Sequence, residues 1–231
     1  MGTERGLHRL VNFSDAIVAI AITLLVLPLA DSASTIGKST LLDFLRHHHN
    51  ELLAFGLSFI VIWNFWWAQH QMIENVVAYS RLFVIGLFIW TLSIVFLPFP
   101  TELLSSADHA GAGVHALYVG AMLLSSTAAL VEQWAITRQP ELQAEEHRGE
   151  ASLVDPVVET VLMAVVFVLV IVAPESGLWW LLLLLLYRPL TLLVRARRGA
   201  APAPGQVPAV PGSGHVPPGP ATGTPRGERA E

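Results

Sequence analysis

The chain has 231 residues, of which 53% are hydrophobic and 13% are charged, whereas a soluble domain carries roughly 25% charged residues. Its formal net charge of −5 offers no basic footprint for binding nucleic acid. Because it contains no cysteine, it has no disulfide, no thiol nucleophile and no thiolate metal site.

Apolar runs recur along the chain, several of them approaching the roughly 20 residues that cross a hydrocarbon core about 30 Å thick. We predict an all-α integral membrane protein with six transmembrane helices, at about residues 13–29, 51–73, 82–103, 113–136, 155–173 and 179–194. The fourth run is rich in Gly, Ala and Ser, which suits close contact between helices in lipid.

The first run starts in a polar stretch that sets two charges and a hydroxyl, Arg9, Ser14 and Asp15, before an apolar helix with no strong breaker until Pro28. At about 100° per residue, one narrow stripe of this helix carries Ala16, Ile20, Thr23 and Leu27. Arg9 and Asp15 project from different faces, so each needs a partner on another helix or subunit. Charge at the membrane boundary is costly, so these residues are candidates for a functional site.

The same N-terminus also has the layout of a cleavable signal peptide, with basic residues, an apolar core and a small-residue segment at 28–33. Asp15 and Ser14 at the start of the apolar core argue against that alternative, as do the further spans.

Prolines are expected to limit two of the later spans. The segment Leu97-Pro98-Phe99-Pro100-Thr101 predicts a proline stop for the third span. Asp155 and Pro156 are typical of an N-cap and a first-turn proline, and they open the fifth span.

Composition changes abruptly after the sixth run. Eight of the fifteen prolines lie beyond residue 200, among Gly, Ala and Ser. We therefore divide the chain into a six-helix transmembrane domain, residues 1–196, and a disordered Pro/Gly-rich cytoplasmic tail, residues 197–231.

The distribution of positive charge predicts the orientation. Two of the thirteen Lys and Arg residues, Lys38 and Arg46, fall in predicted outer loops, and the remaining eleven fall in inner segments. Both termini are therefore expected in the cytoplasm. The second span then brings Trp66 and His70 to the depth of Arg9 and Asp15.

The pattern Arg9-x-x-x-Phe13-Ser14-Asp15-Ala16 resembles the signature of the lysosomal potassium channels, the transmembrane protein 175 family, and of their bacterial relatives. Residues 97–101 also resemble the end of the third helix in that family. The resemblance implies a single-repeat six-helix subunit of a homotetrameric channel in a bacterial inner membrane. It implies no cofactor, and as partners potassium, similar monovalent cations and membrane lipid.

The resemblance also assigns roles to residues. It places the narrowest constriction at Ile20, a hydroxyl layer at Thr23 and a further apolar layer at Leu27. A signature polar network would comprise Arg9, Phe13, Ser14, Asp15 and His70. The family pattern around His70 is Trp-x-x-His-His-Arg, and Gln69 and Gln71 replace two of its residues, which argues against a proton role for this motif.

Other functions and sites carry less support. A secondary transporter is the alternative function, although no pair of Gly/Pro-broken helices is visible in the sequence. An integral membrane enzyme lacks a catalytic constellation. The run His47-His48-His49 is expected to be an exposed loop and not a metal site, and Glu132 a snorkelling or helix-paired carboxylate.

Overall fold

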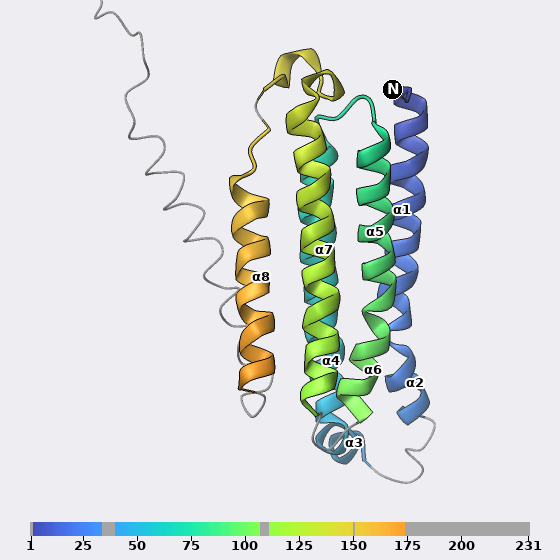
Figure 1. The fold of residues 1–231 in the computed structure, drawn as a ribbon. Coiled ribbons are helices and arrows are strands. Elements are labelled where there is room, and N and C mark those ends of the chain that lie inside the picture. The colour runs from blue at the N-terminus through green and yellow to red at the C-terminus, as the bar shows by residue number, and fades with distance from the viewer. Residues whose placement is uncertain (1, 34–39, 107–110, 150, 174–231) are drawn as a thin grey trace, which may run out of the picture.

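The computed structural model describes residues 2–33, 40–106, 111–149 and 151–173, and Figure 1 shows these as a bundle of roughly parallel and antiparallel helices. The helices are α1 (Glu4–Leu24), α2 (Leu27–Ala33), α3 (Leu41–His47), α4 (His49–Ile73), α5 (Arg81–Phe96), α6 (Pro98–Ser106), α7 (Ala112–Arg138) and α8 (Val154–Val172). Two short 3₁₀ helices, η1 (Pro140–Leu142) and η2 (Glu145–His147), connect α7 to α8. The predicted all-α class is confirmed.

Five stretches of the described chain are long and apolar enough to cross a membrane: Glu4–Ala33, His49–Ile73, Arg81–Ser105, Ala112–Arg138 and Val154–Val172. The chain is a multi-pass membrane protein. The predicted sixth span, 179–194, and the predicted tail, 197–231, lie outside the described residues.

Helix α7 occupies the middle of the bundle, between α5 and α8, and it also contacts α4 and α6 (Figure 1). Helix α1 packs against α5 and α4. Close approach of α5 to α7 depends on Gly86, because a Cβ atom there would lie 2.5 Å from Cγ of Glu132. The largest side chains of the core are almost completely shielded: Trp90, Tyr118, Phe83, Ile62 and Ile94.

Hydroxyl pairs link the helices inside this core. Ser58 of α4 is hydrogen-bonded to Thr101 of α6 at 2.8 Å and to the Tyr118 hydroxyl of α7 at 3.1 Å. Ser93 of α5 and Ser125 of α7 are 2.6 Å apart. Since lipid offers no hydrogen-bond partner, such pairs satisfy polar groups that a membrane helix must otherwise leave unpaired.

Both prolines expected to end a span instead start a new helix. The first span begins nine residues earlier than predicted and breaks at Leu25–Val26. At this break the N–H groups of both residues donate to carbonyls three residues earlier in the chain. Helix α2 follows, with Pro28 in its first turn. In the third span Pro98 is the first residue of α6, which continues to Ser106. Proline is favourable in a first turn, where its missing N–H has no intrahelical partner to lose.

The start of α8 also differs from the prediction. Its N-cap is Leu153, and the hydroxyl of Ser152 accepts a hydrogen bond from the Val154 N–H at 3.2 Å. Asp155 and Pro156 therefore lie inside the first turn, each two positions further into the helix than predicted. An acidic side chain is favourable there as well, beside the positive end of the helix dipole.

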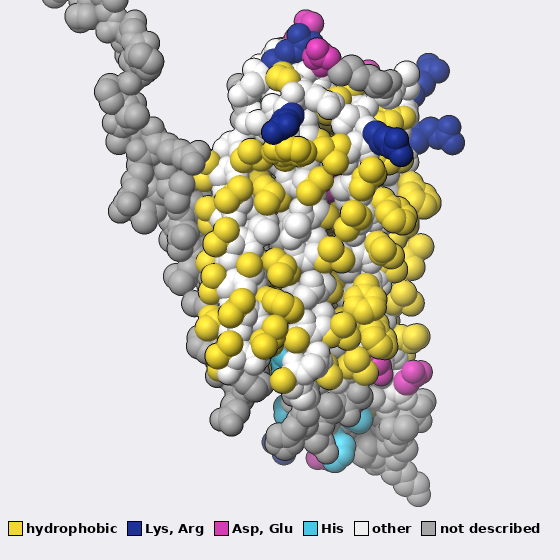
Figure 2. Space-filling model, in the orientation of Figure 1, with side chains coloured by type: hydrophobic (Ala, Val, Ile, Leu, Met, Phe, Trp, Pro, Cys, Tyr) yellow, Lys and Arg dark blue, Asp and Glu magenta, His cyan; other side chains and the backbone are white. Residues whose placement is uncertain are grey.

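The two ends of the bundle differ in charge. Figure 2 shows hydrophobic side chains over the visible face, with most of the Lys and Arg side chains in view near the end where α1 begins. At that end the α4–α5 connection is tied to the α7–α8 connection, because the Leu142 carbonyl accepts from the Val77 N–H at 2.8 Å and the Asn75 carbonyl accepts from the Ala144 N–H at 3.0 Å.

Candidate functional site

Helix α1 has one face in the bundle and one face outside it. The buried face carries Leu7, Ser14, Val18 and Ala21. On the opposite face Phe13, Ile20 and Leu27 keep 65%, 58% and 56% of their surface exposed. The stripe singled out in the sequence is therefore the face of α1 that the rest of the chain leaves uncovered, and it continues across the break into α2.

Thr23 is exposed on the same stripe, one turn beyond Ile20. Its hydroxyl donates to the Ile20 carbonyl at 2.7 Å. Because the hydroxyl proton is used within the helix, the oxygen lone pairs are left free to face a cation. An oxygen in this state can replace part of the hydration shell of a cation.

Asp15 is held from the second span. The indole N–H of Trp66 donates to Oδ1 of Asp15 at 2.9 Å, which joins α4 to α1. His70, one turn further along α4, stacks on Trp66 with ring centroids 5.5 Å apart and on Trp67 at 5.9 Å. The structure thus brings Asp15, Trp66 and His70 together as one aromatic and carboxylate cluster.

Ser14 points the other way, into the bundle. Its hydroxyl lies 2.9 Å from that of Thr91 on α5, and Thr91 in turn donates to the Leu87 carbonyl at 2.8 Å. Ser14 and Asp15 together fix α1 from two sides. This fixes the rotation of α1 about its own axis, and with it the direction of the exposed stripe.

Arg9 does not join this cluster. It lies in an open groove of about 560 Å³ at the start of α1, together with Leu10, Phe13, Tyr79 and Val84. Within the described ranges Arg9 forms no ion pair. The five predicted network residues therefore separate into an Asp15–His70 cluster, an inward Ser14, and Arg9 with Phe13 on the exposed stripe.

Two residues outside the predicted site form a second polar contact between spans. Glu132 of α7 is completely buried, and Gln69 of α4 donates to its Oε2 at 2.6 Å. Glu132 is thus paired between helices, and the alternative that it snorkels to the interface is wrong. The features of the sequence that could have indicated this contact are a lone carboxylate among small residues and the glutamine at position 69.

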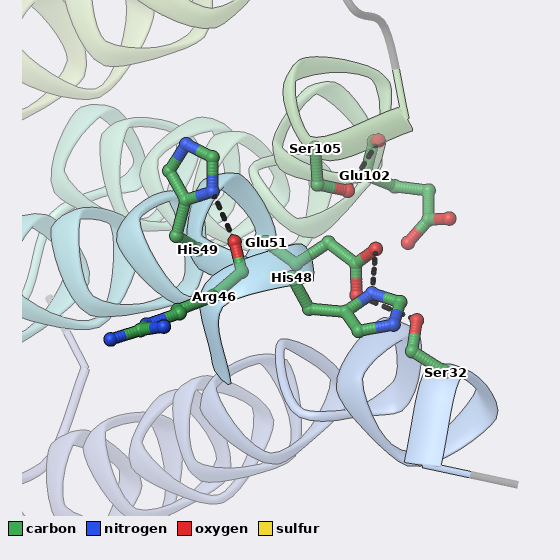
Figure 3. A network of polar contacts seen from close by, with 7 residues as sticks. All are labelled: Ser32, Arg46, His48, His49, Glu51, Glu102 and Ser105. Atoms are coloured by element: carbon green, nitrogen blue, oxygen red, sulfur yellow. Dashed lines mark hydrogen bonds and ion pairs between the residues drawn. The ribbon is translucent and has the colours of Figure 1, made fainter. Parts of the chain in front are cut away.

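The far end of the bundle holds a smaller polar group (Figure 3). Ser32 at the end of α2 donates to Oε2 of Glu51 at 2.6 Å, and Nδ1 of His48 lies 2.8 Å from Oε1 of Glu51. The histidine run expected as a loop is instead the junction between α3 and α4. Among the described residues no group of three His, Cys, Asp or Glu side chains is placed to hold a metal ion.

Comparison with known proteins points to one family. Residues 9–98, which contain the Asp15–Trp66 contact and the whole exposed stripe, match the profile of the endosomal/lysosomal potassium channel TMEM175. Residues 9–98 of the chain are therefore similar to the TMEM175 family. The proteins of this family are channels and not enzymes.

Two individual proteins are also similar to this chain. A potassium channel of Streptomyces collinus is 31% identical over 140 residues, an alignment that covers 56% of this chain and 64% of that protein, slightly less than two thirds of its length. The crystal structure of a threonine-to-alanine variant of the potassium channel MtTMEM175, in complex with a nanobody–MBP fusion protein, superposes with a TM-score of 0.59. That match covers 83% of this chain and 93% of the other at 14% identity, so it establishes a shared fold.

Proposed function

We propose that this chain is a subunit of a potassium-permeable channel whose pore is lined by the exposed stripe of α1. The carrying observation is that α1 is anchored in the bundle by Ser14 and Asp15 while Ile20, Thr23 and Leu27 remain uncovered. The family match and the name of the Streptomyces collinus relative support potassium as the permeant ion.

One exposed stripe cannot enclose a pore, so the proposal requires several copies. Phe13, Ile20 and Leu27 follow one another at seven-residue intervals, with Ala16 and Thr23 between them. This is the a/d spacing by which parallel helices face a common axis. A closed ring of four identical subunits would bring four such stripes together around one ion path.

Selection would occur at the Ile20 layer. A ring of apolar side chains excludes hydrated ions by its size and by the cost of dewetting. The Thr23 hydroxyl oxygens lie one turn beyond, where they can replace part of a lost hydration shell. Potassium sheds its hydration more easily than sodium, so this arrangement favours potassium with moderate selectivity.

The orientation follows from charge. Arg81 at the start of α5, Arg138 at the end of α7 and Arg148 in the α7–α8 connection lie at the end of the bundle where α1 begins, and the connections there are tied together. An excess of Lys and Arg marks the cytoplasmic side. We therefore place that end, and the N-terminus, in the cytoplasm of a cell with the protein in its inner membrane.

A secondary transporter is the competing function, because two spans in the described part of the chain are broken helices, each beside a proline that the sequence pattern predicted to end a span. Transporters use such breaks near the bilayer midplane to bind substrate. Here the breaks at Leu25–Val26 and Leu97 lie towards one end of their spans. Electrical recording and a counterflow assay distinguish the two functions. A channel produces unitary currents, whereas a transporter produces saturable counterflow.

Replacing Ile20 with asparagine is expected to wet and widen the narrowest layer and raise sodium permeation relative to potassium. The measurement is the reversal potential of purified protein in a planar bilayer with potassium on one side and sodium on the other. Phe88→Asn is the matched control, since Phe88 is 66% exposed on α5, away from the stripe. An Ile20→Asn channel that assembles normally with an unchanged permeability ratio would remove Ile20 as the selective layer.

A further inference from the structure

We infer that Phe13 forms a second apolar constriction on the cytoplasmic side of Ile20, with a wider chamber at Ala16 between the two. The inference rests on the proposed function, since it needs α1 to face the pore axis. It gives Phe13 a role in limiting access to the pore, in addition to its place in the signature sequence.

The turn of the helix places Phe13 on the same face of α1 as Ile20. Seven residues turn an α-helix through about 700°, so Phe13 lies within about 20° of Ile20 on the helix surface. The separation along the axis is about 10 Å. If Ile20 faces the pore axis, Phe13 faces it as well, because no helix break lies between them in α1.

The contacts of the residues next to Phe13 hold its ring on the exposed face of α1. Ser14 is bonded to Thr91 at 2.9 Å and Asp15 to Trp66 at 2.9 Å, so the residues next to Phe13 are fixed on the inner faces of α1. Phe13 itself is 65% exposed, and no aromatic partner contacts its ring in the described part of the chain. Its ring is therefore held outward, on the uncovered face.

The side chains along the stripe differ in size. Ala16, between the two large residues, is small and exposed. In a ring of subunits, the Ala16 layer would be wider than the layers of Phe13 and Ile20 on either side. Arg9, one turn before Phe13, is exposed and without an ion pair among the described residues, so it needs water around it. Phe13 is then the first apolar layer that an ion meets from the cytoplasm.

The absence of cysteine from the sequence makes the test direct. Single-cysteine variants Phe13→Cys and Phe88→Cys, recorded in planar bilayers, are exposed from the cytoplasmic side to methanethiosulfonate ethylammonium. Phe88 is the matched control, at 66% exposure against 65%. We expect irreversible loss of current for Phe13→Cys and unchanged current for Phe88→Cys.

A second variant keeps the phenylalanine in place. Ala16→Cys is expected to react from the cytoplasmic side with the small ethylammonium reagent and to be protected from a bulky aromatic methanethiosulfonate. In an Ala16→Cys, Phe13→Ala background, that protection should be lost. Equal reaction of Ala16→Cys with both reagents overturns the inference even if Phe13→Cys fails to assemble.

The same recordings separate this inference from the proposed function. If Ile20→Asn shifts the permeability ratio while modified Phe13→Cys conducts normally, the pore assignment holds and the Phe13 constriction is wrong. If the unmodified protein carries no unitary current, the proposed function fails, and the inference fails with it.

Discussion

Replacing Glu132 with alanine is expected to lower the free energy of unfolding by about 2–5 kcal/mol, the range for truncating a large buried side chain. Glu132 is completely buried in α7, where it accepts the Gln69 amide at 2.6 Å and packs against Gly86 of α5. Truncation leaves a cavity beside Gly86 and a buried amide donor without its acceptor. The measurement is the thermal denaturation of the purified protein in detergent, followed by size-exclusion chromatography.

Two further variants separate the cavity from the orphaned donor. Glu132→Gln keeps both the volume and an acceptor oxygen for Gln69, so it should cost much less than Glu132→Ala. The double variant Gln69→Met, Glu132→Met removes both polar groups and keeps both side chains unbranched at Cγ, where Gly86 leaves no space. Replacing both partners of a buried hydrogen bond with apolar groups of similar shape can be nearly neutral.

Glu141→Ala is the control for the loss of a carboxylate, because Glu141 is exposed in η1. The interpretation is contradicted if Glu132→Ala denatures at the same temperature as Glu141→Ala. The same interpretation is also contradicted if the double methionine variant is less stable than Glu132→Ala. The Gln69–Glu132 hydrogen bond would then stabilise the bundle by more than the volume that the two side chains fill.

The spans were the easiest part of the fold to predict, because twenty apolar residues with few charges have one stable arrangement in a bilayer. The prolines were harder. Pro28 and Pro98 are equally compatible with the end of one helix and the first turn of the next, and only the residues that pack around them decide. A proline in the sequence therefore marks a helix break but does not show whether the proline ends one helix or begins the next.

Buried polar contacts were the least predictable part of the site. In lipid, the outer face of a helix is as apolar as its inner face, so hydrophobic periodicity does not show which side is buried. Thr91 and Gln69 belong to no motif in the sequence that pairs them with a partner, yet Thr91 meets Ser14 and Gln69 meets Glu132 across the bundle. Such pairs join residues more than sixty positions apart, and the sequence of one chain does not reveal which positions meet.

Replacing Asp15 with alanine is expected to reduce both stability and conduction. Hydrogen bonds to charged groups contribute about 1.5–3 kcal/mol, and Asp15 loses the bond from Trp66 that joins α1 to α4. Among the described residues, the Ser14–Thr91 contact would then be the one side-chain hydrogen bond left between α1 and another helix, and it alone would restrain the rotation of α1. A rotated α1 would carry Ile20 off the pore axis, so potassium current and selectivity should fall together. Denaturation temperature and reversal potential of the same preparation test this.

Trp66→Phe gives the sharper test, because it removes the indole N–H and keeps an aromatic ring beside His70. If the bond accounts for the effect, Trp66→Phe should reproduce most of the loss seen in Asp15→Ala, and the double variant should be little worse than either single variant. Glu4→Ala, which removes an exposed carboxylate from the first turn of the same helix, is the control. Additive losses in the double variant would show that Asp15 and Trp66 act independently. Normal stability and current in Asp15→Ala would mean that the carboxylate is only hydrated at the membrane surface, and that packing alone sets the rotation of α1.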